Sequence, residues 1–179
     1  VRFARFETDL RLYCERGAGG VGLMLLQLLG AADASPDTKK RAVDLGVAIQ
    51  LTNILRDVGG DAVDLNRVYL PLEDLRATGA QLDDVLVGRL TPEYVRTVEL
   101  QVARARELYA SARLAVPDLP KASRLVVYAI IELLEAIVDE LEKRGGDSLT
   151  RKLKPSTPAV LGALVRAVRQ SYGGGGGND

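Results

Sequence analysis

Apolar residues recur at helical spacing in the first half of the chain, and Ser and Pro mark where that helix begins. After Ser35-Pro36, apolar side chains follow one another at intervals of three or four residues, at Val43, Val47, Leu51, Ile54 and Val58. This spacing is typical of one buried helix face. Ser accepts hydrogen bonds from the first free backbone N–H groups, and Pro fits the first helical position. The pattern predicts a helix from Pro36 through Asp61.

The same signals predict three more helices in the second half of the chain. Thr91-Pro92 repeats the helix start, and Pro117 breaks the apolar pattern that follows. A mostly apolar stretch over about 122–144 predicts a largely buried helix, which the two glycines after it end. Thr157-Pro158 begins the last helix. No stretch alternates like a strand, so we expect an all-α fold with one domain over 1–172 and a disordered Gly-rich tail over 173–179.

Composition excludes several kinds of site. The chain has no histidine, which rules out Ser/His/Asp and Cys/His catalysis and a His-ligated zinc site. Lys and Arg together number 24, as do Asp and Glu, and this balance gives no sign of a nucleic-acid partner. No stretch reaches the roughly 18 uninterrupted apolar residues of a spanning helix, so we expect a soluble or peripheral protein. The single cysteine, Cys14, is predicted to be a buried packing residue.

A row of oxygen ligands is predicted on the helix that begins at Pro36. Asn53, Asp57 and Asp61 are four residues apart, so they share one face with successive side chains about 6 Å apart along the axis. That spacing suits Mg²⁺ ions that also contact a diphosphate, because Mg²⁺ combines one or two carboxylates with waters and substrate phosphates. From the spacing alone, an ordinary solvated face on which Asp and Asn recur by chance is the simpler interpretation.

Three segments of the sequence carry a more specific signal. The first contains Leu45, Gly46, Gln50, Asn53, Arg56, Asp57, Asp61, Arg67, Tyr69 and Pro71. It resembles the second aspartate-rich signature of the squalene and phytoene synthase family, the head-to-head prenyltransferases. Upstream, Tyr13-Cys14 with the Ala-Gly and Val-Gly pairs over 18–22 is similar to the family's other signature. The basic segment LTRKLKPS over 149–156 is similar to one near the end of phytoene synthases.

The resemblance implies a fold, a reaction and roles for individual residues. The fold would be an isoprenoid-synthase-like helical bundle, and the reaction would join two geranylgeranyl diphosphates head to head into phytoene through prephytoene diphosphate, in carotenoid biosynthesis. Diphosphate leaves readily only when its growing charge is neutralised. The implied metal ligands are Asn53, Asp57 and Asp61, with Mg²⁺ or Mn²⁺ as the ion; Asp57 and Asp61 are catalytic with Tyr13, and Gln50, Arg56, Arg67, Arg151 and Lys152 bind the substrate.

Departures from the family pattern occur at the end of the metal-ligand row. Gly60 stands where the family has Glu, and Leu65-Asn66 replaces a basic pair. The adjacent Gly59 and Gly60 are expected to loosen the helix by about 1 kcal/mol each relative to Ala, unless Gly60 makes room for a kink or a close neighbour.

The family's first D-x-x-x-D motif is a further departure. The family has it upstream of the Tyr-Cys signature, whereas here only Asp33 to Asp37 has the spacing, and Ser35-Pro36 interrupts it. The chain also begins inside a predicted helix. We therefore expect the C-terminal portion of a synthase domain, incomplete at its N-terminus and inactive without the upstream part of that domain.

Two alternatives to phytoene synthesis stay open. One is a squalene or dehydrosqualene synthase that uses farnesyl diphosphate. The other is a non-catalytic relative that serves as an assembly or interaction module. The resemblance also implies a cytoplasmic location with peripheral membrane contact in a bacterium, with the plastid as the alternative.

Overall fold

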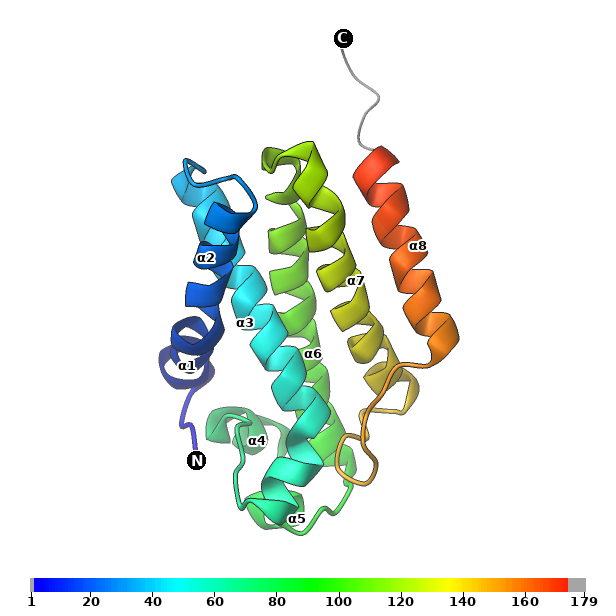
Figure 1. Ribbon diagram of the computed structural model, residues 1–179. Helices are drawn as coiled ribbons and strands as arrows, with labels where there is room; N and C mark the ends of the chain where they lie inside the picture. The colour runs from blue at the N-terminus through cyan, green and yellow to red at the C-terminus, as the bar shows by residue number, and fades with distance from the viewer. Residues whose placement is uncertain (1, 174–179) are drawn as a thin grey trace.

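The computed structural model describes residues 2–173, and every regular element among them is helical (Figure 1). The four long helices are α3 (Pro36–Gly59), α6 (Pro92–Arg113), α7 (Lys121–Lys143) and α8 (Thr157–Gly173). Two short helices, α4 (Leu72–Thr78) and α5 (Leu82–Leu86), lie between α3 and α6, and a 3-10 turn (Val116–Asp118) follows α6. The predicted all-α class is confirmed.

The first helical segment is continuous although two of its turns are wide. It consists of a π-helical turn (Phe6–Leu10), α1 (Arg11–Cys14), a second π-helical turn (Glu15–Gly19) and α2 (Gly20–Leu28). The expectation that the chain begins inside a helix is wrong for residues 2–5, because Arg5 has an extended backbone and the helix starts only at Phe6. Cys14 is 1% exposed, and burial raises the pKa of its thiol to about 12. It is a packing residue, as predicted.

The predicted helix starts are confirmed by their capping bonds. Ser35 Oγ accepts the Thr38 backbone N–H at 3.1 Å, and Thr91 Oγ1 accepts that of Tyr94 at 3.2 Å. The predicted end of the first of these helices differs in detail. α3 ends at Gly59 and continues into a π-helical turn (Gly60–Asp64), so Asp61 stays helical but sits in a wider turn.

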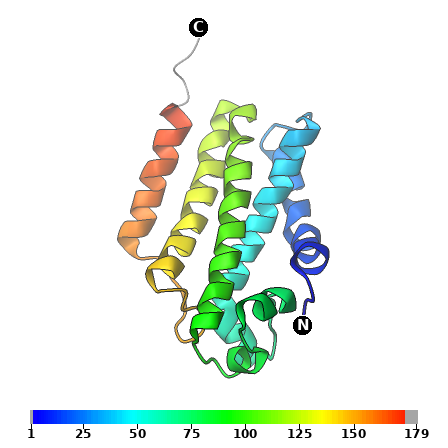
Figure 2. The ribbon, with the colours of Figure 1, turned by 180° about the vertical axis from the view of Figure 1, so that it is seen from behind.

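The long helices stand side by side in one curved row (Figure 1), and the reverse view shows the same order (Figure 2). α2 packs on α3, α3 on α6 and α7, and α7 on α8. The N-terminal segment and α8 thus form the two edges of the row. α4 and α5 lie together at one end, near the end of α3 (Figure 1). The largest fully buried side chains of the core include Leu51, Leu55, Tyr94, Tyr109, Ile131 and Leu141.

The edge helix α8 is held by small residues and by one buried carboxylate. Ala163 and Ala167 are fully buried against α7. Glu132 of α7 accepts from Arg166 Nε at 2.5 Å and from Gln170 Nε2 at 2.7 Å, both on α8. Gly173, which the sequence assigns to the tail, is the last residue of α8, and residues 174–179 lie outside the described part. Within 2–173, no helix has the length and apolar character needed to cross a membrane.

Candidate active site

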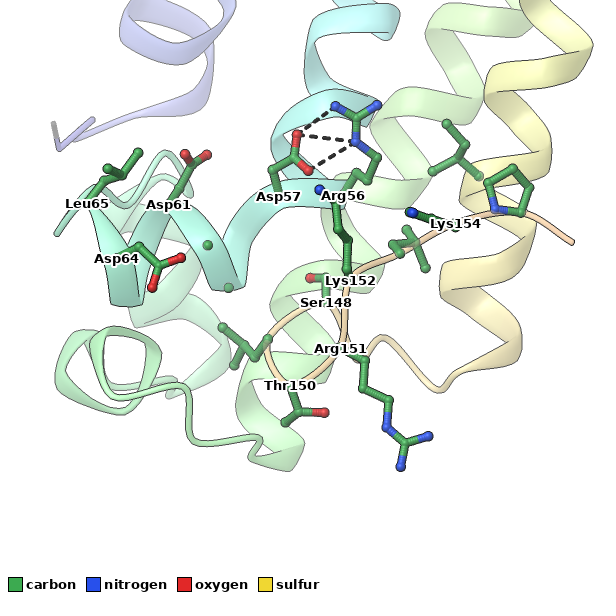
Figure 3. Close-up of a pocket in the computed structure, with 16 residues that line it drawn as sticks. Arg56, Asp57, Asp61, Asp64, Leu65, Ser148, Thr150, Arg151, Lys152 and Lys154 are labelled. Atoms are coloured by element: carbon green, nitrogen blue, oxygen red, sulfur yellow. Dashed lines mark hydrogen bonds and ion pairs between the residues drawn. The ribbon is translucent and has the colours of Figure 1, made fainter.

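A cavity of about 860 Å³ lies between the end of α3 and the segment that connects α7 to α8 (Figure 3). Its first wall is the last turn of α3 with the following π-helical turn, which contributes Asp57, Asp61 and Asp64. Its second wall carries three cationic side chains from one short stretch, Arg151, Lys152 and Lys154. We call residues 147–155 the basic strap. The cavity is therefore lined by carboxylate residues on one wall and by residues with cationic side chains on the other.

Asp61 is electrostatically unfavourable in this cavity. Burial raises the pKa of its carboxyl above the ordinary value, and the nearby charge of Asp57 raises it further, while Arg67 lowers it. Two carboxylates one helical turn apart repel each other unless a cation lies between or beside them. A cation bound at the end of α3 would reduce the repulsion between Asp57 and Asp61.

Arg56 forms an ion pair with its neighbour Asp57. Its Nη2 lies 2.7 Å from Asp57 Oδ2 and its Nε 3.0 Å from Oδ1. The hydrogen bond to Asp57 raises the pKa of the guanidinium. About a third of each side chain is exposed, so the pair is open to the cavity. A metal ion on Asp57 and a phosphate on Arg56 would replace this ion pair with two new ones.

The basic strap does not point all its cations the same way. In Figure 3, Lys152 extends toward Arg56 and Asp57, whereas the Arg151 side chain extends away from the carboxylates. Leu149 and Leu153 are buried and anchor the strap to the protein. Of the two residues that the sequence offered for diphosphate binding here, Lys152 has the suitable direction.

Tyr13 lies in an aromatic cluster beside Asp61. Its ring centroid is 5.3 Å from that of Phe3 and 5.8 Å from that of Tyr69. Burial and the neighbouring Tyr69 raise the pKa of the Tyr13 hydroxyl, and the charge of Asp61 adds to this effect. The side chain is nevertheless 39% exposed. Tyr13 is therefore not a core residue.

The other predicted site residues do not line the cavity. Gln50 and Asn53 are half-buried on α3, on the face that leads to Asp57. Arg67 is exposed, and its backbone N–H donates to the Asp61 carbonyl at 2.7 Å. Of the predicted set, the cavity itself unites Arg56, Asp57, Asp61, Arg151 and Lys152.

Three residues of the site escaped the sequence analysis. Asp64 continues the carboxylate row of Asp57 and Asp61, and the i, i+4, i+7 spacing of the three in the sequence already places them on one helix face. Lys154 lies within the basic segment, two residues beyond Lys152, and lines the cavity. Gly59 was expected to loosen the helix, but a Cβ there would lie 2.3 Å from the Leu149 carbonyl oxygen. The lack of a side chain is what lets the strap approach α3, and no local signal reports such a contact.

The donor set fits Mg²⁺ that shares its coordination with a ligand. Among residues 2–173, no three His, Cys, Asp or Glu side chains are grouped to hold a metal by themselves. Asp57 and Asp61 supply two carboxylates, and Asn53 supplies an amide oxygen one turn earlier. Mg²⁺ commonly takes one or two protein carboxylates and completes its shell with waters and phosphate oxygens. A diphosphate between the carboxylates and the strap would supply those oxygens.

These features agree with one protein family. The sequence matches the profile described as "Squalene/phytoene synthase" over residues 2–159, and the chain belongs to that family. It is 38% identical over 174 residues to "Phytoene synthase 1, chloroplastic" of Solanum lycopersicum, which covers 95% of this chain and 42% of the relative. It is 39% identical over 174 residues to "Phytoene synthase 3, chloroplastic" of Zea mays, covering 95% and 40%.

Solved structures show the same fold. A dehydrosqualene synthase in complex with ligand superposes with a TM-score of 0.83 at 28% identity, covering 94% of this chain and 58% of the other. The squalene synthase HpnC from Alicyclobacillus acidocaldarius gives a TM-score of 0.76 at 28% identity, covering 80% and 53%. The resemblance and the fold predicted from it are confirmed. The chain spans about two fifths of the length of the two phytoene synthases named above.

Proposed function

We propose that this chain carries the second metal-binding wall of a prenyltransferase that joins two geranylgeranyl diphosphates head to head into phytoene, through prephytoene diphosphate. The observation that carries the proposal is the single cavity in which Asp57 and Asp61 face Lys152 and Lys154. A wall of carboxylates opposite a wall of lysines suits a ligand such as a diphosphate with bound metal ions. The phytoene synthase names of the relatives favour the geranylgeranyl substrate over a shorter one.

In this proposal Asn53, Asp57 and Asp61 hold Mg²⁺, or Mn²⁺ in its place, together with the substrate. The bound ion neutralises the charge that grows on the departing diphosphate. Arg56 leaves Asp57 and binds a phosphate oxygen, for which its planar fork is suited. Lys152 and Lys154 bind from the opposite wall, with Arg67 and Arg151 at the rim and Gln50 as a hydrogen-bonding neighbour.

Tyr13 is proposed to face the reacting carbon chain. Loss of diphosphate leaves a carbocation, and the face of a tyrosine ring attracts a cation through its quadrupole. Phe3 and Tyr69 pack against the ring, at 5.3 Å and 5.8 Å between centroids. The Tyr13 hydroxyl is protonated at neutral pH because the ordinary pKa of tyrosine is about 10, and burial raises this pKa further. The aromatic cluster thus offers a neutral surface that does not trap the cation as a covalent adduct of a phenolate.

Two other functions have specific support. The solved relatives are a squalene and a dehydrosqualene synthase, which favours farnesyl diphosphate as the substrate. Gly60 and Leu65-Asn66 depart from the family pattern, which favours a non-catalytic module. The chloroplast location in the relatives' names supports the plastid alternative for this chain, and the bacterial peripheral membrane location and the upstream part of the domain as a partner remain proposals.

Product analysis with the full-length protein tests these functions. We expect phytoene from geranylgeranyl diphosphate when Mg²⁺ is present and no product in excess chelator. Conversion of farnesyl diphosphate alone would instead identify the squalene-type enzyme. A folded protein that converts neither substrate and does not bind inorganic diphosphate with Mg²⁺ would support the assembly module and contradict the proposal.

A further inference from the structure

The basic strap is fixed to the protein core at one end by a buried hydrogen bond. Ser148 is 2% exposed, and its Oγ lies 2.6 Å from the hydroxyl oxygen of Tyr94, which is itself fully buried. Tyr94 stands in the first turn of α6 and does not line the cavity. Buried tyrosine hydroxyls need a partner, and here that partner belongs to the strap.

A second contact joins the strap directly to the helix that carries the carboxylates. The Gly59 backbone N–H donates to the Ser148 carbonyl at 3.1 Å. At the same place, a Cβ on Gly59 would lie 2.3 Å from the Leu149 carbonyl oxygen and 3.0 Å from that of Ser148. A side chain there would have to push the strap away from α3. Gly59 lies two residues from Asp57 and two from Asp61, so any displacement would change the width of the cavity itself.

The strap also holds its own shape next to these contacts. The Asp147 carboxylate accepts the backbone N–H groups of Leu149 at 3.1 Å and Thr150 at 2.9 Å, and it accepts the Thr150 hydroxyl. Farther along, Arg144 Nη1 donates to the Lys152 carbonyl at 3.2 Å. Lys152 and Lys154 therefore follow a hydrogen-bonded turn, and Ser148 within that turn bonds to Gly59 of α3 and Tyr94 of α6.

We propose that Gly59, Ser148 and Tyr94 are positioning residues that set the distance between the lysines of the basic strap and the carboxylates of α3. None of the three needs to touch the substrate. They act by keeping the two walls of the cavity at the spacing that a metal-bound diphosphate requires. The inference rests on the proposed function, because it assigns to the cavity the binding of a diphosphate.

Two substitutions in the full-length protein test the inference. Gly59→Ala adds the Cβ that would displace the strap, and Tyr94→Phe removes the hydroxyl that holds Ser148. Each has a matched control. Gly20→Ala adds a Cβ to a helix where nothing lies within 4 Å. Tyr109→Phe removes the hydroxyl of another buried tyrosine of α6, which bonds to Thr52 at 2.8 Å and not to the strap.

The first readout is Mg²⁺-dependent binding of inorganic diphosphate, measured by calorimetry. We expect Gly59→Ala to weaken binding about tenfold or more, because the added Cβ overpacks the contact and pushes the strap away from α3. Tyr94→Phe should weaken it about fivefold, the value of one hydrogen bond. In turnover assays both should raise KM more than they lower kcat. Amide hydrogen exchange at Leu149 and Thr150 should become faster. The controls should keep wild-type diphosphate affinity, although Tyr109→Phe should lower thermal stability.

The results separate this inference from the proposed function. Folded Gly59→Ala and Tyr94→Phe proteins that bind diphosphate as the wild type does would overturn the positioning role and leave the function intact. Equal weakening by Tyr94→Phe and Tyr109→Phe would overturn it as well, since a general loss of stability would then explain both. If Gly59→Ala does not fold, Tyr94→Phe decides alone. A wild-type protein that neither binds diphosphate nor turns over substrate would overturn the function and this inference with it.

Discussion

Two rows of carboxylates with similar helical spacing lie in different surroundings in this protein. Asp57, Asp61 and Asp64 follow one another at the end of α3, and Glu132, Glu135 and Asp139 do so on α7. On α7, arginines from other helices meet the row. Arg113 contacts Glu132 at 2.6 Å and also Glu135, Arg106 contacts Asp139 at 2.5 Å, and Arg166 contacts Glu132 at 2.5 Å. Among the described residues, the α3 row makes a single ion pair, that of Asp57 with the adjacent Arg56.

The difference shows how packing separates a structural charge row from a binding row. The α7 row is neutralised within the protein, and its buried member Glu132 joins α6, α7 and α8. In the α3 row, burial raises the pKa of Asp61, and the nearby charge of Asp57 raises it further. A cation bound beside these two carboxylates would reduce the repulsion between them and so stabilise the folded protein. Spacing along the helix does not distinguish the two rows, because the compensating arginines come from elsewhere in the chain.

The largest expected effect comes from removing a charge from the α3 row. In the full-length protein, Asp57→Asn or Asp61→Asn should lower turnover by about 10³-fold or more, since each removes charge stabilisation of the leaving diphosphate. Far-UV circular dichroism should show an unchanged helical fold. Asp139→Asn, the same substitution in the α7 row, is the matched control and should keep turnover. Wild-type turnover that persists in excess chelator would contradict the assignment of the α3 row to metal.

The next largest effect concerns stability and the α7 row. Glu132→Gln should lower the free energy of unfolding by about 3 kcal/mol, because the buried Glu132 carboxylate accepts hydrogen bonds from Arg113, Arg166 and Gln170. Denaturant titration measures this change. Glu142→Gln removes an exposed partner of Arg106 and should cost less than about 1 kcal/mol. A Glu132→Gln protein as stable as the wild type would show that the α7 row is not the structural element that the contacts indicate.

A smaller effect should appear in the pH dependence of stability without metal. Because the folded pKa of Asp61 is raised, the folded protein holds this proton more tightly than the unfolded chain does. Its contribution to stability is therefore full below the ordinary carboxyl pKa and is lost as the pH rises through the folded pKa.

The Asp61→Asn variant should lack this loss. In metal-free buffer at neutral pH it should be more stable than the wild type, by at most about 1 kcal/mol given its partial exposure. Thermal melts across acidic to neutral pH test this, with and without Mg²⁺, which should stabilise only the wild type. Parallel pH profiles of stability for the two proteins would show that ionisation of Asp61 does not destabilise the folded protein.

The smallest effect is expected at Gly60. A Cβ there meets nothing nearer than Asp64 Oδ2 at 3.8 Å, so the structure does not support the alternative of a close neighbour. Gly60→Glu should stabilise the protein by about 0.5 kcal/mol through helix propensity. It should also lower the Mg²⁺ concentration for half-maximal turnover about twofold, because a further carboxylate beside the proposed metal ligands attracts the cation.

Gly60→Gln separates these two contributions. It supplies a similar helix propensity without the charge, so it should raise stability and leave the Mg²⁺ requirement unchanged. An equal Mg²⁺ requirement for Gly60→Glu, Gly60→Gln and the wild type would show that this position does not tune the metal ions.

Much of the local architecture was readable from the sequence because it depends on short-range interactions. Ser35 and Thr91 cap the helices that they were predicted to begin, since a side chain and the N–H groups three residues ahead determine a cap. Apolar periodicity identified the core face of α3 for the same reason. The prediction that α7 is largely buried was wrong, because its buried residues are only Val127, Ile131, Glu132, Ala136, Val138 and Leu141, and Val126 is 51% exposed. The shared face of Asn53, Asp57 and Asp61 follows from helix geometry, and the family signatures pointed to it.

The pairing of distant segments was decided only by the tertiary structure. The basic strap lies roughly 90 residues after Asp61 in the chain, and packing of α3, α6 and α7 places it across the cavity. That packing turns Gly59 from a weak helix residue into the contact point of the strap, and it directs Lys152 rather than Arg151 toward the carboxylates. The same packing places arginines of α6 and α8 against the α7 row, whereas the α3 row pairs only with the adjacent Arg56 among the described residues. Such choices depend on how side chains from several elements fill common space, and no local pattern contains that information.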